Sequence, residues 1–201
     1  MSQPRAAQTR CRLIQAGAAE FARCGYAGTK LLTVATAADV SMGALTFHFP
    51  SKRNLSDTIR AHGKRTTRRE VTSAAATAAS ATQSIVDITH CLARLLHDDA
   101  TVRAARRLDA ADWSETWLPR LHDLSTRAAV SGALRPGIAP GTLTMLATIL
   151  VESGETYATC LAEGRTTTSL SARLTTLWDT ILTAVASDTH RQELMAAGTT
   201  V

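Results

Sequence analysis

The chain has 201 residues, 45% of them hydrophobic and 4% aromatic, so it is long enough for one core domain with a small second one. Its longest apolar stretches are interrupted well before the roughly 18 residues that cross a bilayer, and we expect no transmembrane segment. The net charge of +5 is unevenly spread: residues 1–70 carry twelve Lys and Arg against four Asp and Glu, and residues 71–201 carry ten against thirteen. A basic N-terminal third is typical of a polyanion-binding module.

The N-terminal residues Met1 to Arg12 are polar and show neither the apolar stretch nor the cleavage site of a secretory signal. The four cysteines are scattered along the chain without CxxC spacing, which favours reduced thiols over disulfides or a metal site. Both observations predict a cytoplasmic protein.

Helical patterns dominate, because alanine is abundant and alternating β-branched runs are nearly absent. In the N-terminal part Gly25 is placed to stop the first helix, Asp39 and Val40 to form a turn, and Ser41 and Ser51 to cap the helices that follow them. The residue before Pro50 disfavours helical geometry, so the third helix ends there. The predicted helices run from about Thr9 to Cys24, Leu31 to Ala38, Met42 to His48, and Lys52 past Arg60.

The rest of the chain also predicts helices, so the fold class is all-α. The Ala-rich stretch 73–82 fits either helix or a pliable connector. Pro119 either kinks a helix that begins near Trp113 or starts a new one. The last two helices suit a dimer interface. The remaining predicted helices run from about Thr82 to His97, Val102 to Leu108, Thr142 to Ala162, and Thr168 to Ala186.

Two short helices joined by a tight turn, the second with a capping Ser41, form a helix-turn-helix pattern. Small residues in the second helix let it approach the major groove, and the helix that begins after Ser51 offers free backbone N–H groups and Lys52 to phosphates. From spacing alone, DNA binding and a plain helical packing motif remain equally open. The residues expected to face DNA are Ser41, Met42, Gly43, Ala44, Thr46, Phe47 and His48.

The run VATAADVSMGALTFHFPSKRNL, Val34 to Leu55, together with FARCGYAGT, Phe21 to Thr29, resembles the signature of the tetracycline-repressor (TetR) family. The resemblance implies a three-helix DNA-binding domain over residues 1–55 and a helical ligand-binding and dimerisation domain over residues 56–201. It further implies a homodimer that binds a two-fold operator in double-stranded DNA and a small-molecule effector. We therefore expect a transcriptional repressor.

The resemblance also assigns roles to residues. Thr29 and Lys52 stand at phosphate-contacting positions, and Gly43 to His48 form the recognition helix. The sequence departs from the family at three places: Asp39 replaces the usual turn glycine, Met42 a frequent Lys or Arg, and Thr46 the usual Tyr. Asp tolerates left-handed geometry, so the turn is compatible with Asp39, whereas the other two changes remove expected DNA contacts.

RAAQTR at residues 5–10, GALTFHFPSK at residues 43–52, and the region around Trp117 resemble the γ-butyrolactone receptor branch of the family. That resemblance implies that Trp117 lines the effector cavity, that Ser153 beside Gly154 faces a lactone or furan, and that the target genes concern antibiotic production. From the residues alone, Trp113 and Trp117 fit core packing as well as ligand lining. Ser153, Thr156 and Tyr157 likewise fit either a pocket wall or internal hydrogen bonding.

Enzyme signatures such as GxSxG, HExxH and GxxxxGK[ST] are missing from the sequence, so we predict no catalytic residues and no cofactor. His90 and His97, with Cys91 nearby, lack a third ligand at confirming spacing, so no metal site is predicted. Two alternatives stay open. One is an orphan regulator of the same fold that answers to an antibiotic or to no ligand, and the other is a small-molecule carrier or enzyme with a degenerate helix-turn-helix.

Overall fold

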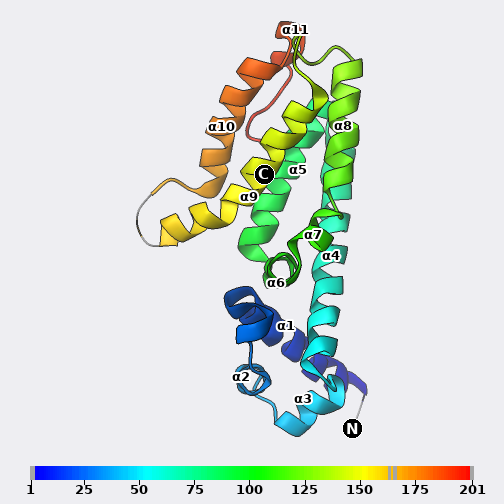
Figure 1. The fold of residues 1–201 in the computed structure, drawn as a ribbon, viewed down its shortest axis with the longest axis vertical. Helices are drawn as coiled ribbons and strands as arrows, with labels where there is room; N and C mark the ends of the chain where they lie inside the picture. The colour runs from blue at the N-terminus through cyan, green and yellow to red at the C-terminus, as the bar shows by residue number, and fades with distance from the viewer. Residues whose placement is uncertain (1–2, 163, 165–166, 200–201) are drawn as a thin grey trace. The chain divides into compact units, whose positions relative to one another are not determined.

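The computed structural model describes residues 3–162, 164 and 167–199, with the side chains of residues 5–154, 164 and 167–199. Within these residues the chain forms helices and a single isolated bridge between Leu134 and Ala186, which confirms the all-α fold (Figure 1). The helices are α1 Gln3–Gly28, α2 Leu31–Ala37, α3 Met42–His48, α4 Lys52–Thr77, α5 Ala81–Asp98, α6 Ala100–Leu108, α7 Ala110–Ser114, α8 Leu118–Val130, α9 Pro140–Ala162, α10 Leu170–Val185 and α11 Asp188–Arg191.

Local signals position most helix ends as predicted. Gly25 breaks α1 with a φ of 67°, although α1 begins six residues before the predicted Thr9. Ser41 caps α3 by accepting a hydrogen bond from the Ala44 N–H, and Asp99 caps α6 in the same way. Pro119 lies in the first turn of α8, so it starts a new helix and does not kink an old one.

The stretch 73–82 is part helix and part connector: α4 continues through Thr77, and a short break then separates it from α5. Helix α7 contains Trp113, where a helix is predicted to begin, and the short α11 has no counterpart among the predicted elements. Among the described residues, no single helix is both long and apolar enough to cross a membrane, although the bent pair α2 and α3, at 105°, together match a broken span in length and composition.

The chain divides into two compact units. The first contains the residues up to Thr67 together with Asp98–Thr116, and the second contains Arg68–His97 and the residues from Trp117 onward. The predicted domain boundary after residue 55 falls inside α4, which runs from the first unit into the second. The units describe packing, so the functional division at that residue stays a prediction.

The core of the first unit packs the helix-turn-helix, α2 and α3, against α1, α4 and α6. Apolar side chains from α1, α2, α3 and α4 meet there, and Ala104 of α6 completes the cluster. The cluster therefore fixes the backs of α2 and α3 and leaves their other faces to solvent. Its buried members are Leu13, Ile14, Ala18, Phe21, Val34, Ala35, Ala38, Leu45, Phe49, Leu55, Ile59 and Ala104.

Candidate nucleic-acid interface

The turn between α2 and α3 is held by its own backbone and by α1. Asp39 adopts a left-handed φ of 52°, and its N–H donates to the Thr36 carbonyl. The guanidinium of Arg12 donates to the Asp39 carboxylate at 3.1 Å and to its carbonyl at 3.3 Å. Aspartate therefore fills the position where the family usually has glycine, and Arg12 secures it.

Helix α3 has a buried back and an open front. Leu45 and Phe49 are completely buried, whereas Phe47 is 75% exposed and Met42 is 36% exposed. Ser41, Gly43 and Thr46 are exposed as well, and Ala44 and His48 are half-buried. The structure thus brings seven of the predicted DNA-facing residues onto one helix and its cap, with the apolar back anchoring that surface.

Two contacts define the chemistry of this front. The Thr46 hydroxyl donates to the carbonyls of Met42 and Gly43, so its hydrogen is engaged within the helix. Its methyl group and the lone pairs of its oxygen are left for contacts outside the helix. The Phe47 ring stands edge-on to the His48 ring, with 5.2 Å between centroids. The front of α3 is therefore largely apolar, with the Phe47 ring, the Met42 side chain and the Thr46 methyl group facing solvent.

Lys52 and Thr29 lie in different environments. The Lys52 ammonium sits 4.7 Å from the centre of the Tyr26 ring and 3.4 Å from the Ala27 carbonyl, which holds a positive charge at the start of α4. Thr29 is only 2% exposed, and its hydroxyl donates to the Gly25 carbonyl at 2.7 Å. The phosphate contact of Thr29 stays a prediction, and in this structure its hydroxyl closes the end of α1.

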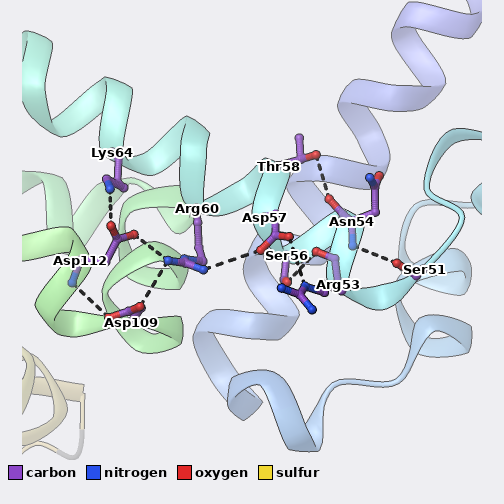
Figure 2. Close-up of polar contacts among 10 residues, drawn as sticks. All are labelled: Ser51, Arg53, Asn54, Ser56, Asp57, Thr58, Arg60, Lys64, Asp109 and Asp112. Atoms are coloured by element: carbon purple, nitrogen blue, oxygen red, sulfur yellow. Dashed lines mark hydrogen bonds and ion pairs between the residues drawn. The ribbon is translucent and has the colours of Figure 1, made fainter.

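The first turn of α4 carries further groups suited to phosphate. Figure 2 shows Ser51 accepting a hydrogen bond from the Asn54 N–H, at 3.1 Å. Arg53 is largely exposed and only loosely paired with Asp57, at 3.8 Å. A capped helix start beside an exposed arginine and Lys52 concentrates positive potential next to α3.

Sequence reasoning missed an ion-pair network behind this surface, also drawn in Figure 2. Arg60 of α4 donates to Asp112 of α7 at 2.7 Å and to Asp109 at 3.2 Å, and Lys64 also binds Asp112. Asp109 caps α7 through the Asp112 N–H. In the sequence, Arg60 and Lys64 are four residues apart and Asp109 and Asp112 are three apart, so each pair lies on one helix face. The two pairs are about 50 residues from each other, and spacing alone does not predict that they meet.

This network predicts a pH dependence. Hydrogen bonds from Lys64 and then Arg60 hold the pKa of Asp112 below its ordinary value. Because the folded-state pKa is depressed, the stabilisation is present above the unfolded-state pKa and is lost as pH falls through the folded-state pKa. Asp112→Asn is therefore expected to lower the free energy of unfolding by about 1 kcal/mol at pH 7, with the difference from wild type shrinking in acid.

Urea denaturation at pH values from 7 down to 3 measures this difference. Asp123→Asn is the control, since Asp123 lies on α8, is exposed, and only weakly pairs with Arg127 at 3.9 Å. A constant difference between Asp112→Asn and wild type over the whole range contradicts the assigned role.

Comparisons with known proteins point to the same surface. The family model described as "Bacterial regulatory proteins, tetR family" matches residues 13–59, which contain all of α2 and α3. A solved γ-butyrolactone receptor (ArpA-like protein) is 26% identical, with 97% of this chain and 96% of that chain covered and a TM-score of 0.75. Residues 13–59 therefore match the DNA-binding part of TetR-family regulators, and the chain as a whole is similar in fold to a receptor of that kind.

Two further TetR-family structures are similar over nearly the whole chain. TylP, a regulator from Streptomyces fradiae, is 28% identical, with 96% of this chain and 93% of that chain covered and a TM-score of 0.66. CprB from Streptomyces coelicolor, solved in complex with its operator sequence, is 26% identical, with 94% of each chain covered and a TM-score of 0.70. No curated protein sequence matches the chain.

The predicted effector-binding residues are divided between the two units. Trp113 lies in the first unit, fully buried, and its indole N–H donates to the Thr67 hydroxyl at 2.9 Å, which favours a packing role. Trp117 and Ser153 lie in the second unit, where Trp117 is buried. The Ser153 hydroxyl donates to the Leu150 carbonyl at 3.0 Å. The side chains of Thr156 and Tyr157 lie outside the described part of the chain.

The described part of the chain holds no group of three or more His, Cys, Asp or Glu side chains placed to bind a metal ion. Cys91 is buried, and burial raises the pKa of its thiol to about 11. It is therefore protonated at neutral pH and a poor nucleophile or metal ligand.

Proposed function

We propose that this chain is a cytoplasmic, homodimeric transcriptional repressor that binds a pseudo-palindromic operator and is released by a small hydrophobic signal, a γ-butyrolactone or furan that regulates antibiotic production. The open front of α3, anchored by the buried Leu45 and Phe49, carries the proposal. The operator complex of the similar protein CprB supports it. Such a protein acts as a regulator and performs no catalysis.

Dimerisation is supported by apolar side chains on the second unit. Met145 and Ile149, one turn apart on α9, are both more than half exposed, and Val130 at the end of α8 is 85% exposed. Three large apolar groups in solvent are costly for a monomer and fit burial against a second copy. In a two-fold dimer the recognition helices would enter successive major grooves about 34 Å apart.

Effector binding acts on the equilibrium between two states of the dimer. A ligand releases DNA only to the extent that it binds one dimer state better than the other. Trp117 is the residue on which the effector assignment depends. To test it, the purified chain bound to DNA from upstream of its own gene is titrated with a synthetic γ-butyrolactone and a furan, with Trp117→Phe as the comparison. Release that weakens in Trp117→Phe supports the proposal, and selective DNA binding that no signal reverses makes the chain an orphan regulator.

Phe47→Ala is expected to weaken operator binding by about tenfold or more, because full burial of a phenylalanine side chain is worth about 1.5–3 kcal/mol. The salt dependence of binding should stay unchanged, since Phe47 carries no charge. Fluorescence anisotropy with labelled operator at several salt concentrations measures both quantities. Thr126→Ala, an exposed position on α8, is the control, and an unchanged affinity in Phe47→Ala would remove α3 from the interface.

Lys52→Gln is expected to behave differently. The loss of one phosphate contact should reduce the slope of log affinity against log salt by about 1 and weaken binding to all sequences alike. Arg127→Gln, which removes an exposed charge from α8, should leave the slope as in wild type. An identical slope for Lys52→Gln and wild type would show that Lys52 does not contact phosphate.

A further inference from the structure

Residues 192–199, here called the strap, follow α11 and run back along α5 within the second unit (Figure 1). Gln83 of α5 forms hydrogen bonds with both backbone polar groups of Met195. Its side-chain N–H donates to the Met195 carbonyl at 3.1 Å, and its carbonyl accepts from the Met195 N–H at 2.8 Å. A side-chain amide that satisfies both backbone groups of one residue recognises the backbone there, whatever the side chain of that residue. The Met195 carbonyl also accepts from the Gly198 N–H at 3.1 Å, so the strap turns over residues 195–198.

The next two turns of α5 continue this recognition. The Asp87 carboxylate accepts from the Thr199 N–H at 2.9 Å, and the Thr199 hydroxyl donates to its second oxygen. The His90 ring Nε2 lies 2.9 Å from the Ala196 carbonyl. Gln83, Asp87 and His90 are spaced four and three apart, so they form one row on a single helix face, here called the polar row.

Gly198 fits the strap to this row. It has a positive φ of 80°, and a Cβ added there would lie 3.4 Å from an Asp87 oxygen and 3.5 Å from the His90 ring. The two contacts are ordinary in length, so the positive φ is what disfavours a side chain at this position. Backbone geometry and hydrogen bonding therefore favour the same sequence, a glycine followed by a residue with a hydroxyl group.

The strap is held more by polar recognition than by apolar burial. Leu194 is its one buried apolar side chain among the described residues, whereas Met195 is 50% exposed. With the strap in place Gln83 and Asp87 are 2% and 3% exposed, and the Gln83 amide also donates to the Asp87 carboxylate at 2.8 Å. Segments with few apolar contacts open locally at a small fraction of the global stability. The row then becomes available to any peptide that makes the same hydrogen bonds.

We propose that Gln83, Asp87 and His90 form a peptide-binding site on α5 and that the strap is its exchangeable occupant. The ligand class is a peptide that forms the same turn and carries a glycine followed by a hydroxyl-bearing residue, as residues 192–199 do. Opening of the strap is a local event that leaves α5 folded. The site is independent of the proposed operator and effector functions.

The test uses the full chain with Gly198→Ala and Thr199→Val, which weakens the strap and leaves the polar row intact. A labelled peptide with the sequence of residues 192–199 should bind this variant, and the same peptide carrying both substitutions should bind about tenfold more weakly or worse. Adding Asp87→Asn to the variant should also reduce peptide binding. No difference between the two peptides would overturn the proposal.

Hydrogen–deuterium exchange provides a second, independent measurement. In the wild-type chain the amides of Met195 and Thr199 should be protected, and in the double variant they should exchange about tenfold faster while the amides of α5 stay protected. Thr189→Val, at an exposed position of α11, should leave the strap protected and serves as the matched control. Protection of the strap that is equal in the double variant and the wild type would overturn the proposal, because it would mean that the polar row does not hold the strap.

Discussion

Phe49→Ala is expected to lower the free energy of unfolding by about 3–5 kcal/mol, the usual cost of deleting a fully buried phenylalanine. Phe49 is 0% exposed and belongs to the cluster that joins α3 to α1, α2 and α4. The guanidinium of Arg10 also lies 5.2 Å from the centre of its ring, so the deletion removes a cation–π contact as well. Without this anchor α3 loses its fixed orientation, and operator binding should fall together with stability.

Phe47→Ala is the matched control, because the same substitution two residues earlier removes a ring that is 75% exposed. Its effect on the free energy of unfolding should stay within about 0.5 kcal/mol, the usual range for surface substitutions. Urea denaturation followed by circular dichroism measures both variants. Similar stability losses in the two variants would contradict the division of α3 into a buried back and an exposed front.

Gly63→Ala is expected to destabilise the first unit by about 1–3 kcal/mol, the range found when an extra methyl group is forced into a packed core. A Cβ at Gly63 would lie 2.4 Å from the backbone carbonyl oxygen of Thr101 and 2.7 Å from the Ala105 Cβ. Backbone cannot move aside as a side chain can, so α4 and α6 must separate. Because α4 follows the recognition helix directly, DNA affinity should fall as well.

Gly141→Ala supplies the control for this prediction. Gly141 lies in α9, where an added Cβ meets nothing within 4 Å, so alanine should be neutral or stabilise the chain by up to about 1 kcal/mol. Thermal unfolding of both variants distinguishes close packing from a general effect of replacing glycine. A neutral Gly63→Ala would show that α4 and α6 do not approach each other this closely.

The helix-turn-helix could be predicted because its determinants are local. Ser41 caps α3 within three residues, Asp39 makes the turn, and Gly25 breaks α1, each through contacts inside one short stretch. The alternation of buried Leu45 and Phe49 with exposed Phe47 also follows from helical spacing. These local rules cover the recognition surface almost completely.

The remaining features depend on contacts between distant parts of the chain. The inclusion of residues 98–116 in the first unit rests on the approach of Gly63 to Thr101 and on the pairing of Arg60 with Asp112. No periodic pattern in the sequence predicts either of these two contacts. From the sequence, Trp113 fits core packing and ligand lining equally well. Its hydrogen bond to Thr67, 46 residues away, favours packing.

The burial of Thr29 is a similar case, because its hydroxyl finds the Gly25 carbonyl only after α1 has broken. The polar row of α5 was hidden for the same reason, since its partners lie more than 100 residues further along the chain. Of the polar row, the sequence singles out only His90, and its spacing from His97 predicts no metal site. The role proposed for the polar row follows only from its hydrogen bonds to the strap.

The most direct test of the account is the selectivity of the purified full chain for DNA. Its affinity for the DNA upstream of its own gene is compared, at physiological salt, with its affinity for a shuffled duplex of equal composition. The account predicts binding about 10³-fold tighter or more to the natural sequence, as specific regulators show. Equal affinity for the two duplexes would contradict it, because a recognition helix that does not discriminate between sequences cannot select an operator.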